Sequence, residues 1–226
     1  MTLPPLSNRL SSALPFVREG SFFADVGTDH AYLPLYLCLV GKVRGAVASD
    51  VREGPLSVAA ANIKAYGLEG KIATCLSDGL ISLAPYAPED IAVCGMGGEL
   101  IASILAAVPW SKDSSRRFIL QPMTKPESLR AYLSREGFAI LDEGLTKDEG
   151  RIYQTICAAY DGITRTLSPL SLLVGESNLS RGGACLAEHL GRLEKTFTEI
   201  ARAKASAGYP TAYEQTVLAE IKEYTK

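Results

Sequence analysis

The feature that most constrains the fold is an alternation of apolar, strand-like runs with helix-like segments, which ends in two strand-like runs. Strand–helix units at this spacing predict a parallel sheet with helices on both faces. The last two runs, Phe138–Leu145 and Ile152–Tyr160, are separated only by the polar turn Thr146–Arg151. That turn is too short for a crossover helix, so we expect this pair to be antiparallel. The five earlier strands are predicted at Ser21–Val26, Arg44–Ser49, Lys71–Leu76, Asp90–Cys94 and Arg117–Leu120.

Helices are expected both before the first strand and between the strands. Apolar residues recur at helical spacing from Leu3 to Val17, which predicts an N-terminal helix over that stretch. Five strand–helix units closed by a β-hairpin are uncommon among dinucleotide-binding sheets, and this order resembles the methyltransferase variant. The remaining helices are predicted at Ala31–Val40, from Pro55 to about Gly67, at Glu99–Val108 and at Pro126–Glu136.

The last third of the chain has a different character. Residues 161–180 are rich in Gly, Ser, Thr and Pro, and we expect them to form a connector. Two amphipathic patterns follow, Leu186–Lys204 and Tyr213–Tyr224, and they predict an antiparallel helical hairpin. Two roles are open for this hairpin. It either serves packing or dimerisation, or it acts as an arm that grips the substrate. We therefore predict a catalytic domain over 1–160 and a connector with a helical hairpin over 161–226.

Composition narrows the class of protein only a little. Apolar residues make up 47% of the chain, which is normal for a globular core, and the formal net charge is −2, so a nucleic-acid footprint must be local. No apolar run approaches the ~20 residues that cross a bilayer, and the N-terminus lacks the pattern of a signal peptide. No two of the five cysteines form a C-x-x-C pair. We expect reduced, buried thiols in a soluble, cytoplasmic protein without a metal site, and no oligomeric partner is evident.

Polar or glycine-containing clusters follow all five of the predicted parallel strands. In an open α/β sheet, ligands bind beyond the carboxyl ends of the strands. Five clusters at that one edge therefore predict a binding site. The clusters are Asp25–His30, Asp50, Ser77–Gly79, Gly95–Gly98 and Gln121–Pro122.

The first cluster, with the pattern D-x-G-x-D-H, disfavours a phosphate ligand. Gly27 lets a ligand approach the backbone, but the further glycines that seat a pyrophosphate are missing. Two carboxylates repel phosphate and suit a ligand with a cationic part. Asp50 follows about 20 residues later, where a carboxylate accepts ribose hydroxyls, and Asp78 is placed to accept the exocyclic amino group of adenine. These features favour S-adenosyl-L-methionine over NAD.

Structural roles are open for several of these residues when each is taken alone. Asp25 is able to cap the following turn, and His30 is able to serve as a satisfied residue at a helix start. Asp50 and Asp78 are acceptable as ordinary loop residues. For Gly97 and Gly98, the alternative to a binding role is that they only allow a helix to pack closely. The coincidence of all five clusters with this topology is what favours binding.

Five stretches carry a resemblance to a known family. They are Asp25–Pro34 (DVGTDHAYLP), Ser77–Leu80, Gly95–Gly98 (GMGG), Leu120–Pro122 and Glu149–Tyr153. Together they resemble the bacterial TrmK family of tRNA adenine-N1 methyltransferases, closely over residues 6–160 and in kind over the C-terminal helices. The resemblance implies an α/β fold, a Rossmann-like class I S-adenosylmethionine-dependent methyltransferase sheet with a C-terminal α-helical (coiled-coil) hairpin. It also implies methylation of the adenine at tRNA position 22.

The chemistry of this reaction indicates which residue types the site needs. Adenine N1 already carries a lone pair, so transfer needs positioning and electrostatics rather than a strong base, and the adenine must be unpaired or flipped out. We expect Asp29, His30 and Tyr32 to line the active site, with the Asp29 carboxylate favouring the cationic product. The residues expected to bind the cofactor are Asp25, Gly27, Asp29, Asp50, Asp78, Gly79, Gly95 and Met96. Those expected to bind the substrate are Gly97, Gly98, Gln121, Pro122 and Arg151.

Contact with tRNA requires positive charge, which the sequence concentrates in two places. Neutralisation of phosphates by such clusters gives salt-sensitive binding, although a solvated helix face is an equally open role. The residues concerned are Lys112, Arg116, Arg117, Lys125, Arg130 and Arg135 around the fifth strand, and Lys195, Arg202 and Lys204 on the hairpin.

Three other functions are alternatives to tRNA methylation. A methyltransferase acting on another substrate and a catalytically inactive RNA-binding relative both stay open. An NAD-dependent oxidoreductase requires a phosphate-binding glycine turn, which the first cluster lacks.

Overall fold

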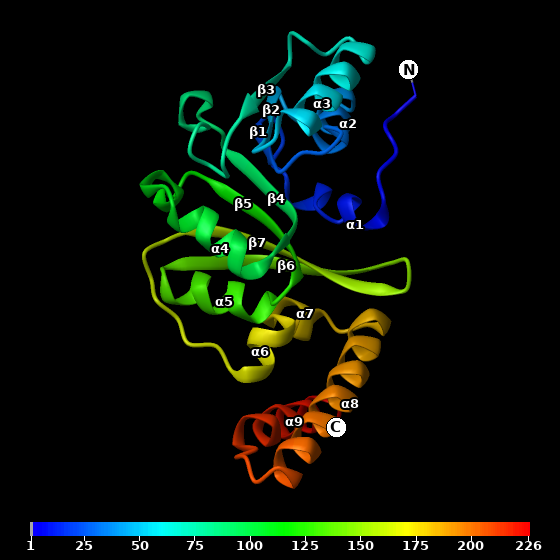
Figure 1. Cartoon of the computed structure of the whole chain (residues 1–226), viewed down its shortest axis with the longest axis vertical. Coiled ribbons are helices and arrows are strands. Elements are labelled where there is room, and N and C mark those ends of the chain that lie inside the picture. Colours follow the sequence, from blue (N-terminus) through cyan, green and yellow to red (C-terminus); the bar gives the residue numbers. More distant parts are fainter. Residues whose placement is uncertain (1) are drawn as a thin grey trace.

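One seven-stranded sheet forms the centre of the computed structural model, which describes residues 2–226 (Figure 1). Its strand order is β3-β2-β1-β4-β5-β7-β6. Strands β1 to β5 are parallel, and β7 pairs antiparallel with both β5 and β6. The predicted topology is therefore confirmed. The strands are β1 Phe22–Val26, β2 Gly45–Asp50, β3 Ile72–Leu76, β4 Asp90–Gly97, β5 Arg117–Thr124, β6 Phe138–Asp148 and β7 Arg151–Tyr160.

Helices cover both faces of the sheet, because neighbouring residues of a strand point to opposite sides. On one face, Ala24 and Val26 of β1 belong to a core with apolar side chains of α4 and α5. On the other face, Phe23 packs in a second core with α2 and α3. These helices are α2 Tyr32–Leu39, α3 Glu53–Ala65, α4 Gly98–Ala106 and α5 Pro126–Arg135, and short 3-10 turns η2 Ala84–Tyr86 and η3 Pro109–Lys112 lie between strands.

The β6–β7 hairpin is longer than predicted. The ladder continues to the pair Asp148–Arg151, so the turn contains only Glu149 and Gly150. Both residues have positive φ, 45° and 75°, as a two-residue hairpin turn requires. The expected turn Thr146–Arg151 was too wide because its polar side chains resemble loop residues, although its backbone pairs regularly.

The predicted N-terminal helix over residues 3–17 is wrong. Only α1 (Asn8–Ser11) and the 3-10 turn η1 (Leu14–Phe16) are helical in this stretch. Pro15 has no N–H group for an α-helical bond, so a helix through this position loses a hydrogen bond. The apolar spacing has another cause: Ala13 and Val17 are buried in the core on the α2 and α3 side of the sheet.

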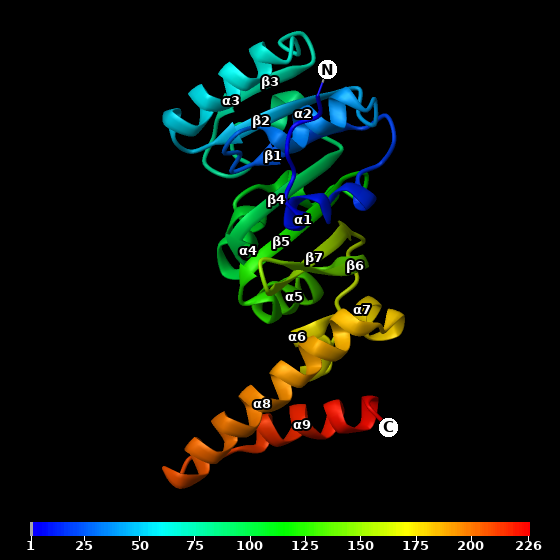
Figure 2. The same cartoon turned by 90° about the vertical axis from the view of Figure 1, so that its right-hand side faces the viewer.

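The C-terminal part forms a separate apolar cluster below the sheet (Figure 2). Leu190 and Phe197 of α8 pack with Val217 and Ile221 of α9, as the predicted hairpin requires. The expected connector is not free of structure, because it contains two short helices that pack against α5 and β6. The division at residue 160 stays a prediction. The helices are α6 Pro169–Val174, α7 Glu176–Arg181, α8 Ala184–Ser206 and α9 Ala212–Tyr224.

Candidate active site

Hydrogen bonds bring the ends of the first three strands together at the carboxyl edge of the sheet. The backbone N–H groups of Gly27 and Thr28 both donate to the carbonyl of Ser49, each at 2.8 Å. The N–H of Ser77 donates to the carbonyl of Asp50 at 3.0 Å. The polar clusters that follow β1, β2 and β3 in sequence are therefore neighbours in space.

Asp25 is the second-last residue of β1, and its carboxylate is almost fully buried, because only 9% of the residue's surface is exposed. Burial raises its pKa to about 6. The Thr28 hydroxyl opposes this shift by donating to Oδ2 at 2.7 Å, and the nearby charge of Asp50 adds to it. One hydroxyl and no cation is poor compensation for a buried charge. Asp25 is thus suited to a cationic ligand.

A cavity of about 150 Å³ opens beside Asp25, and we call it the acidic-turn cavity. Five residues that the sequence predicts for the site line its wall. They are Asp25, Gly27, Asp29, His30 and Tyr32, which were predicted to bind the cofactor or to line the reaction site. The other lining residues come from the same turn, from the start of α2, from β4 and from α1. The lining is Asp25, Gly27, Thr28, Asp29, His30, Ala31, Tyr32, Leu33, Cys94, Arg9 and Leu10.

The three residues predicted to line the reaction site lie next to one another at this cavity. His30 Nε2 lies 3.2 Å from Asp29 Oδ2, and the His30 and Tyr32 rings are stacked with centroids 5.0 Å apart. The Asn62 side chain donates to the His30 carbonyl at 3.0 Å, which ties the turn to α3. Asp29 faces solvent, with 77% of its side chain exposed. The trio is thus accessible to a macromolecular substrate.

The glycines at the ends of β1 and β4 serve two different purposes. Gly27 has φ +76°, and a Cβ there would overlap the terminal methyl of Met96, so Met96 reaches across from β4 onto the turn. A Cβ on Gly98 would overlap the carbonyl of Lys125 instead. Gly98 is buried, and this close approach of α4 to the end of β5 is sufficient reason for its presence. The packing role that was left open for Gly98 therefore has direct support.

The remaining predicted cofactor residues lie along the same edge but outside the cavity wall. Asp50 is 7% exposed, and its Oδ1 accepts the Arg52 N–H at 2.9 Å. Asp78 is exposed in the turn after β3, where Gly79 has φ +56° and accepts the Ser77 hydroxyl at 2.9 Å. Gly95 is exposed at the end of β4.

The predicted substrate residues do not form one surface. Pro122 is buried at the end of β5, and Gly97 is half-buried at the start of α4. Arg151 is exposed at the tip of the β6–β7 hairpin and does not line the acidic-turn cavity. Gln121 is fully buried, and its side chain binds Arg9 and Ser12 of the N-terminal segment. Gln121 therefore supports the site from behind.

Arg9 is a site residue that the sequence argument missed. Arg9 lines the acidic-turn cavity from α1. Its guanidinium donates to Gln121 Oε1 at 2.6 Å and lies 5.9 Å from the centre of the Tyr153 ring. Arg9 stands more than 100 residues from both of these partners in sequence. No strand end and no local spacing marks it, so only the folded chain reveals its position.

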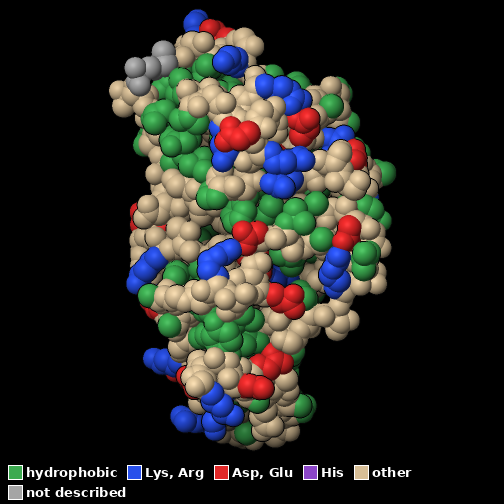
Figure 3. All heavy atoms as spheres, turned by 180° about the vertical axis from the view of Figure 1, so that it is seen from behind, with side chains coloured by type: hydrophobic (Ala, Val, Ile, Leu, Met, Phe, Trp, Pro, Cys, Tyr) green, Lys and Arg blue, Asp and Glu red, His purple; other side chains and the backbone are tan. Residues whose placement is uncertain are grey.

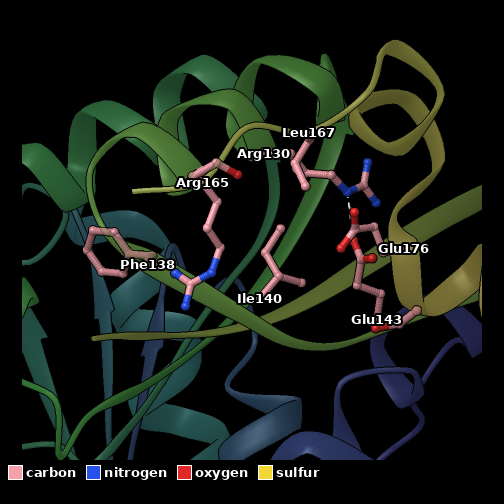
Figure 4. Close-up of a pocket in the computed structure, with 9 residues that line it drawn as sticks. Arg130, Phe138, Ile140, Glu143, Arg165, Leu167 and Glu176 are labelled. Atoms are coloured by element: carbon pink, nitrogen blue, oxygen red, sulfur yellow. Dashed lines mark hydrogen bonds and ion pairs between the residues drawn. The ribbon is translucent and has the colours of Figure 1, made fainter. Parts of the chain in front are cut away.

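A second cavity, of about 120 Å³, lies where the sheet meets the C-terminal helices (Figure 4). Arg130 of α5 is fully buried there, and its Nε donates to Glu143 Oε1 at 2.7 Å. The same guanidinium donates to Gln154 Oε1 and to the carbonyls of Leu172 and Val174. The interpretation of Arg130 as a tRNA contact is therefore wrong, because this side chain is enclosed by protein.

The other members of the predicted basic cluster are mostly neutralised. Lys112 pairs with Glu136 at 3.2 Å, and Lys125 pairs with Glu99 at 2.7 Å. Basic and acidic side chains are interspersed on the face in Figure 3. On the hairpin, Lys204 is bound to Glu214 at 2.6 Å. Lys195 and Arg202 are exposed on α8 and have no carboxylate within 4.0 Å among residues 2–226.

Several other expectations concern what the described residues contain. No helix among residues 2–226 is long and apolar enough to span a bilayer. The same residues hold no grouping of three His, Cys, Asp or Glu side chains suited to a metal ion. All five cysteines are free thiols; Cys38 and Cys157 are buried, whereas the other three are partly exposed. The expectation of uniformly buried thiols was thus too simple.

Comparison with known proteins shows a family. A family model described as "Methyltransferase domain" matches residues 6–156. The tRNA (adenine(22)-N(1))-methyltransferase of Bacillus subtilis is 36% identical over 166 residues, which cover 70% of each chain. The crystal structure of B. subtilis TrmK, an M1A22 tRNA methyltransferase, has a TM-score of 0.83 at 30% identity and covers 98% of this chain and 96% of its own.

A structure of a second relative contains a ligand. Sp1610 from Streptococcus pneumoniae, solved in complex with S-adenosyl-L-methionine, has a TM-score of 0.85 at 28% identity, and the match covers 98% of this chain and 100% of that one. The predicted class I methyltransferase fold is therefore confirmed. The matches extend over the sheet, the acidic turn and the C-terminal helices. The chain belongs to the TrmK family of tRNA (adenine(22)-N(1))-methyltransferases.

Proposed function

We propose that this protein transfers the methyl group of S-adenosyl-L-methionine to N1 of an adenine in tRNA, the adenine at position 22. The observation that carries the proposal is the acidic-turn cavity, which places Asp25, Asp29, His30 and Tyr32 around one space at the carboxyl edge of the sheet. This is where ligands bind in open α/β sheets. Membership of the TrmK family supports tRNA as the substrate class.

The residues at this edge fit S-adenosyl-L-methionine by charge and by shape. Asp25 and Asp29 offer negative charge to its sulfonium and ammonium groups, and Gly27 keeps the turn free of a side chain. Asp50 uses Oδ1 for the Arg52 N–H, so its second oxygen is available to ribose hydroxyls. When bound, the cofactor supplies an electrophilic methyl group on sulfur. Asp78, exposed at the next strand end, is the proposed partner of adenine.

The protein's own contribution to the transfer is positioning and electrostatics. Adenine N1 needs no deprotonation before it attacks, so a general base is not required. The stacked His30 and Tyr32 rings offer a flat surface for an unpaired base. The Asp29 carboxylate lies beside them and is solvent-facing, and it stabilises the positive charge that N1-methyladenine acquires.

The proposed substrate is a polyanion, and exposed cations without a carboxylate partner are candidate contacts for its phosphates. Lys195 and Arg202 on α8 are such cations, which favours the arm role over the packing role for the hairpin. As an enzyme of tRNA, the protein is proposed to act in the cytoplasm.

The test is methyl transfer to unmodified tRNA transcripts with labelled S-adenosyl-L-methionine. We expect incorporation into a transcript with adenine at position 22 and loss of incorporation when that base is guanine. Mapping the product should place N1-methyladenine at position 22. Equal labelling of both transcripts would mean another target, and absence of labelling together with intact cofactor binding would indicate an inactive relative.

Cofactor binding is tested separately by calorimetry. Asp25→Ala and Asp50→Ala should each weaken S-adenosyl-L-methionine binding by about 10- to 100-fold, because each removes a charged hydrogen-bond acceptor. A matched control is Asp113→Ala, which removes an exposed carboxylate from the loop before β5. Unchanged affinity in both site variants would sink the assignment of the site.

A further inference from the structure

Arg9 is the only Lys or Arg among the residues that line the acidic-turn cavity in the described part of the chain, and its Nη1 would lie 3.5 Å from a Cβ on Gly95, the neighbour of the lining residue Cys94. The remaining charged groups of that lining are the carboxylates Asp25 and Asp29 and the imidazole of His30. A cavity that offers negative charge on one side and a guanidinium on another is suited to a ligand that carries both signs.

A neutral side chain holds the Arg9 guanidinium in place. Gln121 accepts from Arg9 Nη1 at 2.6 Å, and the same amide donates to the Arg9 carbonyl at 2.6 Å. The buried end of β5 thus grips both the side chain and the backbone of Arg9. The Tyr153 ring lies 5.9 Å from the guanidinium and supports it through a cation–π contact. Arg9 is therefore oriented before any ligand binds.

The positive charge of Arg9 is not balanced by an acid. Within residues 2–226 no carboxylate lies within 4.0 Å of its guanidinium, whereas Arg18, Arg44 and Arg130 are each paired with one. An arginine has five N–H donors in a planar fork, and the bond to Gln121 occupies one of them in this part of the chain. The others are free to bind an anion in a bidentate way.

The approach to the guanidinium is kept open by a glycine. A Cβ on Gly95 would lie 3.5 Å from Arg9 Nη1, so any longer side chain at that position would lie against the guanidinium. Gly95 follows Cys94, which lines the cavity. The end of β4 therefore passes beside Arg9 without covering it.

We infer that Arg9 binds the α-carboxylate of the methionyl part of S-adenosyl-L-methionine, with Gln121 as its positioning residue. This inference rests on the proposed function. The methionyl part carries an ammonium and a sulfonium as well as the carboxylate. The acidic turn attracts the two cationic groups, and Arg9 supplies the one counter-charge that the carboxylate needs. Without Arg9, the carboxylate would lie in a cavity whose lining carries the carboxylates of Asp25 and Asp29 and no Lys or Arg from the described part of the chain.

Calorimetry with two ligands isolates this contact. S-adenosyl-L-methionine and its decarboxylated analogue differ in the carboxylate alone, so each is titrated into the wild type and into Arg9→Met. We expect the variant to bind S-adenosyl-L-methionine about 10- to 100-fold more weakly, the usual loss for a hydrogen bond to a charged group. Binding of the decarboxylated analogue should be unchanged. Arg9→Lys keeps the charge and should restore part of the discrimination.

The control is Arg44→Met, the same substitution in an arginine that pairs with Glu89 before β2, at the opposite edge of the sheet. It should leave both affinities unchanged. An equal loss for both ligands in Arg9→Met would overturn the inference, since Arg9 would then act by holding the N-terminal segment. No loss for either ligand would overturn it too. Absence of binding by the wild type would instead defeat the proposed function.

Discussion

Two of the regions in which this molecule buries charged side chains treat that charge in opposite ways. At the joint between the sheet and the C-terminal helices, Arg130 makes four hydrogen bonds, one of them to the Glu143 carboxylate. At the acidic-turn cavity, Asp25 receives one hydroxyl, and the Arg9 guanidinium donates to one amide. Both regions thus hold ionisable groups, but only the joint pairs opposite charges within the described chain, and even there the second carboxylate oxygen of Glu143 has no hydrogen-bond partner.

The difference separates a structural role from a binding role. A buried, hydrogen-bonded ion pair holds two parts of a chain in one arrangement, and its loss is costly. A buried or half-buried charge without a counter-ion costs stability and remains available to a ligand. The joint therefore fixes the C-terminal helices on the sheet, whereas the charge at the cavity is available to the cofactor that we propose binds there. Breaking each region should have opposite consequences.

The largest effect is expected from Arg130→Met. It leaves Glu143 buried without its cation and frees two carbonyls, so we expect a loss of about 3–5 kcal/mol in the free energy of unfolding. Urea denaturation measures the loss. Calorimetry should show unchanged affinity for S-adenosyl-L-methionine in the folded variant, because the cavity at the joint and the acidic-turn cavity share no lining residue.

The matched control for this substitution is Arg135→Met on the same helix. Arg135 is exposed and pairs with Glu136, and such surface pairs contribute about 0–1 kcal/mol. Similar losses in Arg130→Met and Arg135→Met would mean that the buried network is not a structural joint.

The two regions also differ in how far they follow from the sequence. The clusters at Asp25–His30, Asp50 and Ser77–Gly79 stand directly after apolar strands, so the rule for open α/β sheets placed them at one edge. Arg130 lies on a helix with the amphipathic pattern of a surface element, and that pattern predicts an exposed cation that contacts tRNA. Its burial depends on Glu143, Gln154 and the backbone of α6, which meet it only after folding.

The N-terminal segment shows the same limit in the fold. Periodicity from Leu3 to Val17 was interpreted as a helix, but the contacts that fix this stretch are long-range. Ser12 shares a hydrogen bond of 2.6 Å with Thr155, and Arg9 is bound by Gln121. A local pattern reports which side chains are apolar, and it does not report partners more than 100 residues away. The site was therefore predicted without its cation.

A second prediction concerns Asp25 and pH. Its folded pKa is about 6, above the ordinary value of 3.8, so the folded state holds this proton more tightly than the unfolded chain. The resulting penalty is absent below pH 3.8, grows as the pH rises toward 6, and is constant above it. At 1.36 kcal/mol per pH unit, it amounts to about 3 kcal/mol.

The substitution Asp25→Asn should therefore stabilise the protein by up to about 3 kcal/mol at pH 8, and the gain should vanish as the pH falls toward 4. Urea denaturation across this range measures the gain. The same variant should bind S-adenosyl-L-methionine more weakly, because the amide has no charge for its cationic groups. The exposed Asp78→Asn is the matched control and should change stability by less than about 0.5 kcal/mol. A gain that does not vary with pH would contradict buried ionisation.

The smallest effect is expected for tRNA binding by α8. Unlike the buried charges compared above, its cations Lys195 and Arg202 are exposed, and within residues 2–226 they have no carboxylate partner. If Lys195 and Arg202 contact phosphates, Lys195→Gln and Arg202→Gln should each lower the slope of log affinity for tRNA against log salt by about one. Arg192→Gln is the control on the same helix, since Arg192 already pairs with Glu188 at 2.6 Å. Filter binding at several salt concentrations measures the slopes. Slopes that match the wild type in both test variants would return the hairpin to a packing role, because an arm that grips tRNA through these cations must release counter-ions when they bind.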